Sequence, residues 1–145
     1  MDTGDLNDAY TVRSLDDLAT IYATPLPQIA NKETDHITDV GRAFIAASPF
    51  LVLATSNGES IDGSPKGDAP GFVQQLDDRT LLIPDRPGNN RIDGMQNLLV
   101  NPQVGIIFMV PGSNETYRVT GSAAISTDPA LLKRCEVQGK LPRVV

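Results

Sequence analysis

Hydrophobic residues along this chain follow two spacings, one typical of helices and one typical of strands. Between residues 35 and 47 they recur at helical spacing, which predicts a helix with one apolar face. That face comprises Ile37, Val40, Phe44 and Ile45. A shorter helix is expected to begin after Ser14, because Asp17 follows three residues later and the two side chains can form a capping box. A final helix is predicted over 128–137.

Short apolar runs between turn residues predict strands in the middle of the chain. The run 50–55 is bounded by Pro49 and by Asn57-Gly58, which indicates a buried strand followed by a hairpin turn. Residues 61–68 contain two glycines and a proline, so they suit only an irregular or edge strand.

The remaining strands are expected over 80–83, 104–110 and 117–120. Residues 104–110 are apolar throughout, as in a strand covered on both faces. Residues 117–120 alternate, which indicates one wet and one dry face. Short strands joined by tight turns favour an α+β fold in which a mostly antiparallel β-barrel or curled sheet carries flanking helices.

The acidic charge of the chain is concentrated at its N-terminus. Of 145 residues, 1–39 hold eight acidic and two basic side chains, whereas 40–145 hold ten of each. We therefore expect an acidic arm with a short helix over 1–34, followed by one domain over 35–145 that is either complete or truncated at its C-terminus. The acidic excess says little about a ligand of that domain.

Residue usage excludes several classes of protein. One cysteine, Cys135, and one histidine, His36, leave no internal disulfide, thiolate metal cluster or multi-histidine zinc site, so no metal is expected. Trp is absent and no basic run is present, which argues against a nucleic-acid partner. The longest apolar stretch, 43–54, is too short and interrupted for a membrane span, and the N-terminus lacks a secretory pattern, so a cytoplasmic location is expected.

The segment 81–102 is the first candidate for chemistry, because a strand leads through a tight loop into a helix. Asn90 is expected to cap this helix, with Asp93 completing a capping box and with Ile92, Met95 and Leu99 facing the core. Arg91 would then lie in the first turn, beside unpaired backbone N–H groups, where a bound phosphate would favour a cation. The alternative is an ordinary cap with a solvated arginine.

The segment 64–71 is the second candidate. Its glycines let backbone approach a flat or anionic ligand, and Ser64 and Lys66 would serve as donors. The alternative is a bulged edge strand that proline and lysine protect from aggregation.

Taken together, these segments resemble a known family. The sequences "SPKGDAPGFV", "LLIPDRPGNNRIDGMQNLLVNPQVGIIFMVPG" and "ETYRVTGSA" occur in the order typical of the pyridoxamine phosphate oxidase-related, FMN-binding split-barrel family, and of its subgroup of FMN-dependent enzymes in particular. The resemblance covers about residues 35–137 and implies a split barrel that binds FMN.

The resemblance also implies which residues form the cofactor site. The FMN phosphate would be bound by Asn89, Asn90 and Arg91. The flavin ring would lie against Ile83, Pro84 and Asp85. Donors to the ring and ribityl chain would come from Ser64, Lys66, Gly67 and Asp68. A partner subunit would contribute Glu115, Thr116 and Arg118, because relatives are homodimers with FMN at the interface.

The function implied is that of an FMN-dependent oxidoreductase acting on a small, unidentified substrate. Flavin carries out the electron transfer, so no catalytic nucleophile or base is required of the protein. NAD(P)H could act as donor only by binding transiently, because no GxGxxG motif is present. Residues 141–145 resemble the start of a further strand, whose absence argues against pyridoxamine phosphate oxidase activity itself. A non-catalytic flavin-binding or storage module and a cofactor-free dimeric scaffold are the alternatives.

Overall fold

The computed structural model describes residues 7–30 and 32–145. Backbone contacts divide the chain into two units, Met1–Thr34 and Asp35–Val145. The expected acidic arm starts with residues 1–6, which lie outside the described residues. Among the described residues, every helix is too short or too polar to traverse a lipid bilayer.

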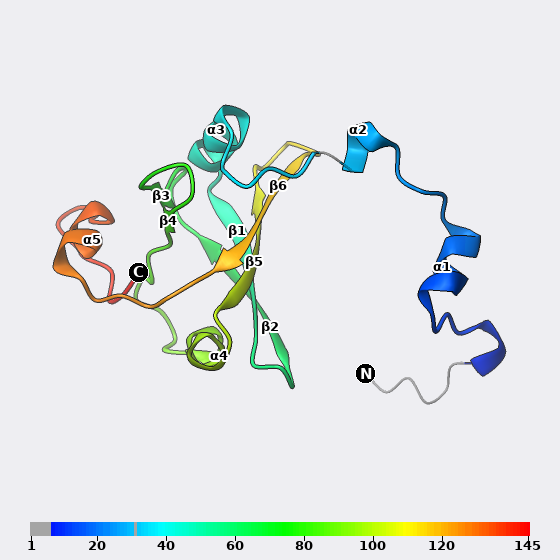
Figure 1. Ribbon diagram of the computed structural model, residues 1–145. Coiled ribbons are helices and arrows are strands. Elements are labelled where there is room, and N and C mark those ends of the chain that lie inside the picture. The colour runs from blue at the N-terminus through cyan, green and yellow to red at the C-terminus, as the bar shows by residue number, and fades with distance from the viewer. Residues whose placement is uncertain (1–6, 31) are drawn as a thin grey trace. The chain divides into compact units, whose positions relative to one another are not determined.

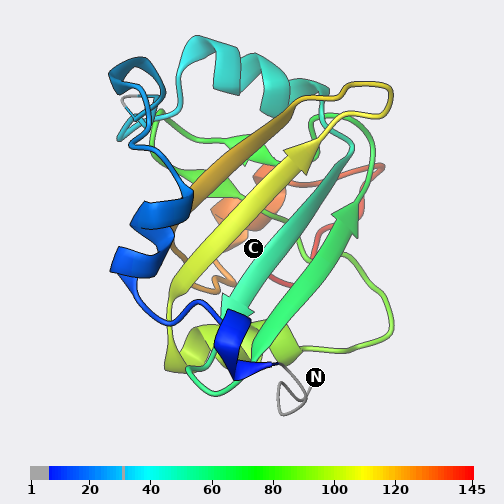
Figure 2. The same cartoon turned by 90° about the vertical axis from the view of Figure 1, so that its right-hand side faces the viewer.

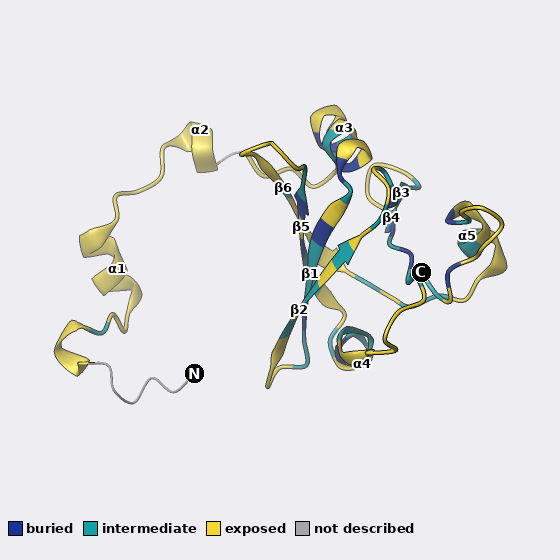
Figure 3. Cartoon of the chain, turned by 180° about the vertical axis from the view of Figure 1, so that it is seen from behind, coloured by how far each residue is buried: buried dark blue, intermediate teal, exposed yellow. Residues whose placement is uncertain are grey.

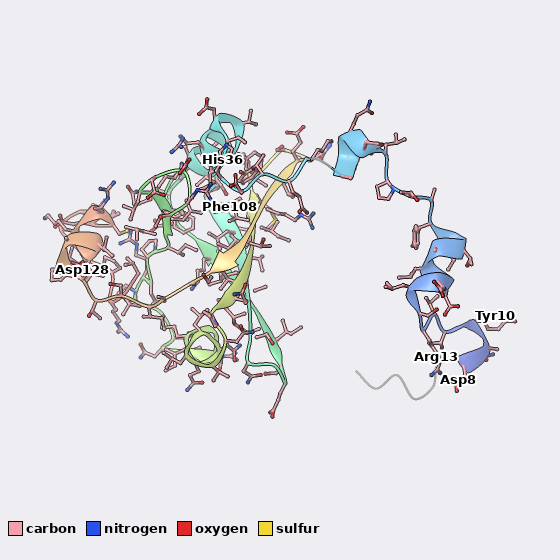
Figure 4. The ribbon with its side chains drawn as sticks, viewed as in Figure 1. Asp8, Tyr10, Arg13, His36, Phe108 and Asp128 are labelled. Carbon is pink, nitrogen blue, oxygen red and sulfur yellow. The ribbon has the colours of Figure 1, made fainter. Side chains whose placement is uncertain are left out.

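The described part of the N-terminal unit, residues 7–30 and 32–34, contains three short helices without buried residues (Figure 1). They are the 3-10 helix η1 (Asp8–Tyr10), α1 (Leu15–Ile21) and α2 (Pro27–Ala30). The capping box of α1 is confirmed, because Asp17 N–H donates to Ser14 Oγ at 3.0 Å and Ser14 N–H donates to the Asp17 carboxylate at 3.0 Å. Arg13 and Asp8, both labelled in Figure 4, form an ion pair just before this helix.

A four-stranded antiparallel sheet forms the centre of the second unit. Its strands are β1 (Phe50–Ser56), β2 (Ile61–Gly67), β5 (Gln103–Met109) and β6 (Thr116–Ser122). They lie in the order β2-β1-β5-β6, which Figure 2 shows face on. Both the hairpin at Asn57-Gly58 and the edge position of the glycine-rich strand are therefore confirmed.

A second, two-stranded sheet lies on one side of the first. It pairs β3 (Gln74–Gln75), which the sequence did not predict, with β4 (Leu81–Leu82). The end of the chain adds to this layer, because Arg143 and Val144 exchange backbone hydrogen bonds with Asp85, and Val145 exchanges two with Ser126. The two sheets remain separate, so the fold is an antiparallel split barrel that is not closed.

Helices flank the large sheet at its two ends and on one face. The helix α3 (Asp39–Ala47) crosses one end of the sheet and α4 (Asp93–Val100) crosses the other, whereas α5 (Pro129–Arg134) lies on the same side as β3 and β4 (Figures 1 and 2). The expected start of the first of these at residue 35 is wrong. It begins four residues later because Thr38 caps it, accepting a hydrogen bond from Gly41 N–H.

The core lies between the large sheet and the β3-β4 layer. Alternate residues of β1 and β5 point into it, among them Leu51 and Phe108, which are fully buried (Figures 3 and 4). Tyr117 and Val119 of β6 pack against this cluster, as the alternation of residues 117–120 predicts. Val40, expected on the apolar face of α3, is instead 79% exposed, because only the side of that helix with Gly41 and Ile45 meets the core.

The outer face of the large sheet is exposed in this chain. The expectation that 104–110 is covered on both faces is therefore wrong for the chain alone. Ile106 and Phe108 are buried, whereas Ile107 between them is 38% exposed. Phe50 and Ile61 add apolar side chains to the same face, because they pair in register with Met109 and Ser56. Apolar side chains are thus left in contact with solvent on a broad sheet surface.

Candidate functional site

A cavity among the described residues opens on the inner face of the sheet and has a volume of about 680 Å³. Strands β1, β2, β4, β5 and β6 form its floor and one wall. The loop 89–92, the first turn of α4 and the segment 120–125 form the rest of the rim, together with Val144 and Val145. This volume falls in the range typical of small-molecule sites.

The floor of the cavity is an apolar row that runs across three strands. Leu53 of β1 is paired in register with Ile106 of β5, which is paired with Val119 of β6. All three residues line the cavity. A row of aliphatic side chains at one level of a sheet presents a nearly flat surface, which suits the face of a planar ring.

Polar groups of β2 continue this row on one side. Ser64 pairs with Leu53, and Asp62 and Lys66 lie on the same inner face two residues away on either side. The Lys66 ammonium is 4.0 Å from the Asp85 carboxylate, and the two side chains are 24% and 30% exposed. This partly desolvated pair places one positive and one negative charge at the border of the cavity.

The loop before α4 does not have the predicted capping geometry. Asn90 adopts a left-handed backbone conformation with φ of 60°, so it cannot be the N-cap, and its side chain accepts a hydrogen bond from Arg143 instead. The N-cap is Ile92, which has no side-chain oxygen to offer the helix. The expected capping box with Asp93 is therefore wrong.

Consequently, the N-terminus of α4 is a place where an anion would be favoured. Its first N–H groups, those of Asp93, Gly94 and Met95, have no intrahelical acceptors, no side chain caps them, and these residues line the cavity. Arg91 lies before the helix rather than in its first turn. Its Nε donates to the Asp93 carboxylate at 3.0 Å, and its backbone N–H donates to Asn89 Oδ1 at 3.1 Å.

The expected apolar face of α4 is also only partly correct. Met95 is half-buried, but Ile92 is 48% and Leu99 is 80% exposed. The residue that α4 buries is Asn97, whose Nδ2 donates to Thr55 Oγ1 of β1 at 3.1 Å. A single polar contact thus takes the place that the helical spacing assigned to aliphatic side chains.

A smaller cavity of about 190 Å³ adjoins the first and shares Pro65, Lys66 and Asp85 with it. Arg86 spans its side, donating to the Asp68 carboxylate at 2.9 Å and to the Cys135 carbonyl at 2.8 Å. The pKa of Asp68 is lowered because its carboxylate accepts a hydrogen bond from Ala69 N–H and, secondly, because Arg86 is close. This cluster connects β2 to α5 and has the character of a structural anchor.

The structure brings about half of the predicted site residues together. The main cavity is lined by Ser64, Lys66, Ile83, Asp85, Asn89 and Arg91. The smaller cavity is lined by Gly67, Asp68 and Pro84, and also by the predicted residues Lys66 and Asp85. Asn90 lies in the same loop without lining either cavity.

The three residues expected from a partner subunit lie elsewhere. Glu115 is in the turn before β6, and Thr116 and Arg118 are exposed on this strand. They alternate with Tyr117 and Val119, which face the core, so they point to the outer face of the sheet. Within one chain they do not reach the cavity.

Several lining residues were missed by the sequence analysis. Asp62 could have been found, because it precedes Ser64 by two positions and shares its face of the strand. Thr55, Arg79 and Val145 reach the cavity only through the tertiary fold, and no local pattern marks them. His36, whose Nδ1 donates a hydrogen bond to Asp35 Oδ1, and Cys135, which is buried, do not line it.

Comparison with known proteins agrees with the fold described above. The sequence profile of the pyridoxamine 5'-phosphate oxidase family matches residues 37–142, most of the chain. The chain belongs to this family. Comparison with curated proteins found no match.

Two solved structures resemble this member of the family in fold. Both are of HupZ from Group A Streptococcus, one of them a histidine-to-alanine variant. The variant structure is 23% identical in sequence with a TM-score of 0.57, and the match covers 74% of this chain and 89% of that chain. The other is 20% identical with a TM-score of 0.58 and covers 74% and 84%. At these identities the likeness shows the fold alone.

Proposed function

We propose that this chain is an FMN-dependent oxidoreductase acting on a small substrate, with the flavin bound in the main cavity. The observation that carries the proposal is the combination, in one cavity, of a flat apolar row with an uncapped helix N-terminus. Leu53, Ile106 and Val119 suit the flavin ring, and the N-terminus of α4 with Arg91 suits its phosphate. Membership of the pyridoxamine 5'-phosphate oxidase family supports the same reading.

A heme-like ligand is the other cofactor class common in this family. Heme iron is held in proteins by histidine, cysteine, methionine or tyrosine side chains. Among the described residues that line the cavity, Met95 alone carries such a ligand atom. The donor set of the cavity is therefore better suited to a flavin phosphate than to heme iron.

The residues of this chain would bind, orient and tune the cofactor. When bound, FMN supplies hydride and electron transfer. Ser64 offers a hydroxyl to the polar edge of a ring lying on the apolar row, and Lys66 offers a positive charge that stabilises added electron density. Asp85 holds Lys66 at that edge, and Arg91 with Asn89 lies at the anionic end.

We propose further that the chain is a homodimer that associates through the outer face of its sheet. Phe50, Ile61 and Ile107 are exposed there, although residues 104–110 have the apolar sequence of a covered strand. Glu115, Thr116 and Arg118 lie at or beside this face, so in such a dimer they would lie in the interface between the two sheets. A cytoplasmic location and NAD(P)H as a transient donor are part of the same proposal.

The test is a visible absorption spectrum of the purified chain before and after addition of FMN and removal of the excess. We expect a bound flavin spectrum, a much weaker response to hemin, and slow turnover with NAD(P)H as donor. Bound flavin without turnover would favour the flavin-storage module. A folded chain that binds no flavin would contradict the proposal and favour the cofactor-free scaffold.

Matched variants separate the phosphate site from the fold. Arg91→Ala should weaken FMN binding by about 10- to 100-fold and leave riboflavin binding nearly unchanged, since only FMN carries the phosphate. Arg134→Ala, which removes an exposed arginine of α5, is the control and should change neither affinity. Equal FMN affinities in the two variants would contradict the assignment of the phosphate site.

The dimer has its own pair of variants. Ile107→Asp places a charge on the outer sheet face and should yield monomers in sedimentation analysis, because the charge would be desolvated in the interface. Val40→Asp alters an equally apolar but differently placed exposed residue and should leave the dimer intact. Dimers that persist in the first variant would show that another surface holds the copies together.

A further inference from the structure

The buried hydrogen bond between Asn97 and Thr55 joins α4 to β1, two elements that both line the cavity. Asn97 is 7% exposed and Thr55 is 3% exposed, and the residues are 42 positions apart in sequence. A hydrogen bond between buried groups is costly to break, because neither group can turn to water instead. The pair therefore restricts the position of α4 on β1 more firmly than an exposed bond would.

The same threonine lies beneath the first turn of α4. At Gly94, an added Cβ would be 3.5 Å from Thr55 Oγ1 and 3.4 Å from Asp62 Oδ2, so the first turn rests directly on these two side chains. Gly94 precedes Asn97 by three residues and lies on the same side of the helix. Thr55 thus contacts α4 both where Asn97 holds it and where its N–H groups open to the cavity.

Apolar packing does little to fix α4 in this place. Ile92, Leu99 and Val100 are exposed, and Met95 and Leu98 are only half-buried. A helix held by so little apolar contact could turn or slide on the sheet without its polar contact. The position of its N-terminus would then change relative to Arg91 and to the apolar row.

We propose that Asn97 is a positioning residue for the phosphate group of the ligand. By its bond to Thr55 it holds α4 in the rotation at which the N–H groups of Asp93, Gly94 and Met95 face the cavity. Asn97 does not itself line the cavity. This inference rests on the proposed function, since it concerns the phosphate end of the same site.

The test compares two neighbouring amides of one helix. Asn97→Leu removes the buried hydrogen bond while keeping a branched side chain with the same number of heavy atoms, whereas Gln96→Leu changes an exposed side chain one residue away. We expect Asn97→Leu to weaken FMN binding by about tenfold while riboflavin binding changes less than about twofold, and Gln96→Leu to change neither. A merely structural role would lower the melting temperature and leave the ratio of FMN to riboflavin affinity unchanged, which would overturn the proposal.

A second pair of variants tests the same hydrogen bond from the Thr55 side, in case Asn97→Leu does not fold. Thr55→Ser keeps the hydroxyl that accepts the bond and should retain the preference for FMN over riboflavin. Thr55→Val keeps the shape without the hydroxyl and should lose that preference as Asn97→Leu does. Equal behaviour of the serine and valine variants would overturn the proposal.

Amide hydrogen exchange separates this inference from the proposed function. In the chain without ligand, Asn97→Leu should speed exchange along α4 relative to Gln96→Leu, because the helix loses its fixed place. Titration with inorganic phosphate should shift the Gly94 amide resonance in the original chain and less in Asn97→Leu. If the original chain binds neither FMN nor phosphate, the proposed function fails, while unchanged exchange in Asn97→Leu would overturn the positioning role itself.

Discussion

The Tyr117 side chain occupies the space beside Gly41 into which any other residue would project its Cβ. Gly41 is in the first turn of α3 and Tyr117 is on β6, and the added atom would overlap the tyrosine hydroxyl and ring. The tyrosine ring is also in contact with Phe44, their centroids being 6.3 Å apart. Helix and strand are therefore packed at a distance that only glycine permits.

Replacing Gly41 with alanine tests this packing, because the resulting change in the free energy of unfolding should have opposite signs with and without the Tyr117 side chain. Gly41→Ala should lower the free energy of unfolding by about 1–3 kcal/mol, because overpacking outweighs the better helix propensity of alanine. In a Tyr117→Val background the space is open, and the same substitution should stabilise the chain by up to about 1 kcal/mol. Denaturant unfolding of the four proteins measures both effects, and a destabilisation of equal size in the two backgrounds would contradict the packing account.

Arg86 is expected to stabilise the fold through its two partners. Arg86→Ala should lower the free energy of unfolding by about 2 kcal/mol, because it leaves the half-buried Asp68 carboxylate and the Cys135 carbonyl without a charged donor. Arg134→Ala is the control, since that side chain is exposed. Chemical denaturation decides the matter, and similar values for both variants would show that Arg86 contributes no more than an ordinary surface arginine.

Acid is expected to weaken the contacts of Asp35. The hydrogen bond to His36 and, secondly, the guanidinium of Arg79 lower the pKa of Asp35 from 3.8 to about 2. Since the pKa in the folded state is the lower one, the stabilisation is fully present above pH 4 and is lost as the pH falls toward 2. The unfolding curves of the original chain and of Asp35→Asn should therefore differ above pH 4 and converge near pH 2. Parallel curves over this range would contradict the assignment.

Cys135 is expected to be unreactive in the folded chain. Its side chain is 2% exposed, and burial raises the pKa of its thiol despite the nearby Arg86 and Arg134. Because the thiolate is the reactive form, modification by Ellman's reagent at pH 8 should be slower by about two orders of magnitude than in guanidinium. Rapid modification of the native chain would show that α5 opens readily.

The elements that sequence predicted correctly are those defined by neighbouring residues. The capping box of Ser14 and Asp17, the hairpin at Asn57-Gly58 and the alternation around Tyr117 all depend on groups a few positions apart. The predicted cap at Asn90 failed for a related reason. Its side chain bonds to Arg143, a residue 53 positions away, and its backbone turns into the left-handed region.

The residues of the candidate site also differ in whether neighbouring residues in the sequence were enough to predict them. Ser64, Lys66 and Arg91 were predicted from local patterns, a strand with alternating donors and a loop with an arginine, and Asp85 was predicted from the family resemblance. All four line the cavity, and their binding roles stay predictions. The smaller cavity beside it, with Asp68 and Pro84, could not be distinguished from the main one, since β2 and the segment after β4 contribute residues to both.

The sequence by itself determined which segments form strands, where the turns between them lie and which charged side chains a ligand could meet. These features follow from side-chain type and short-range spacing. Only the tertiary structure decided that α4 buries Asn97 rather than Leu99, and that Gly41 meets Tyr117. Such contacts join segments far apart in the chain. Their energies depend on which surfaces the folded sheet brings together, and no periodicity in the sequence records that choice.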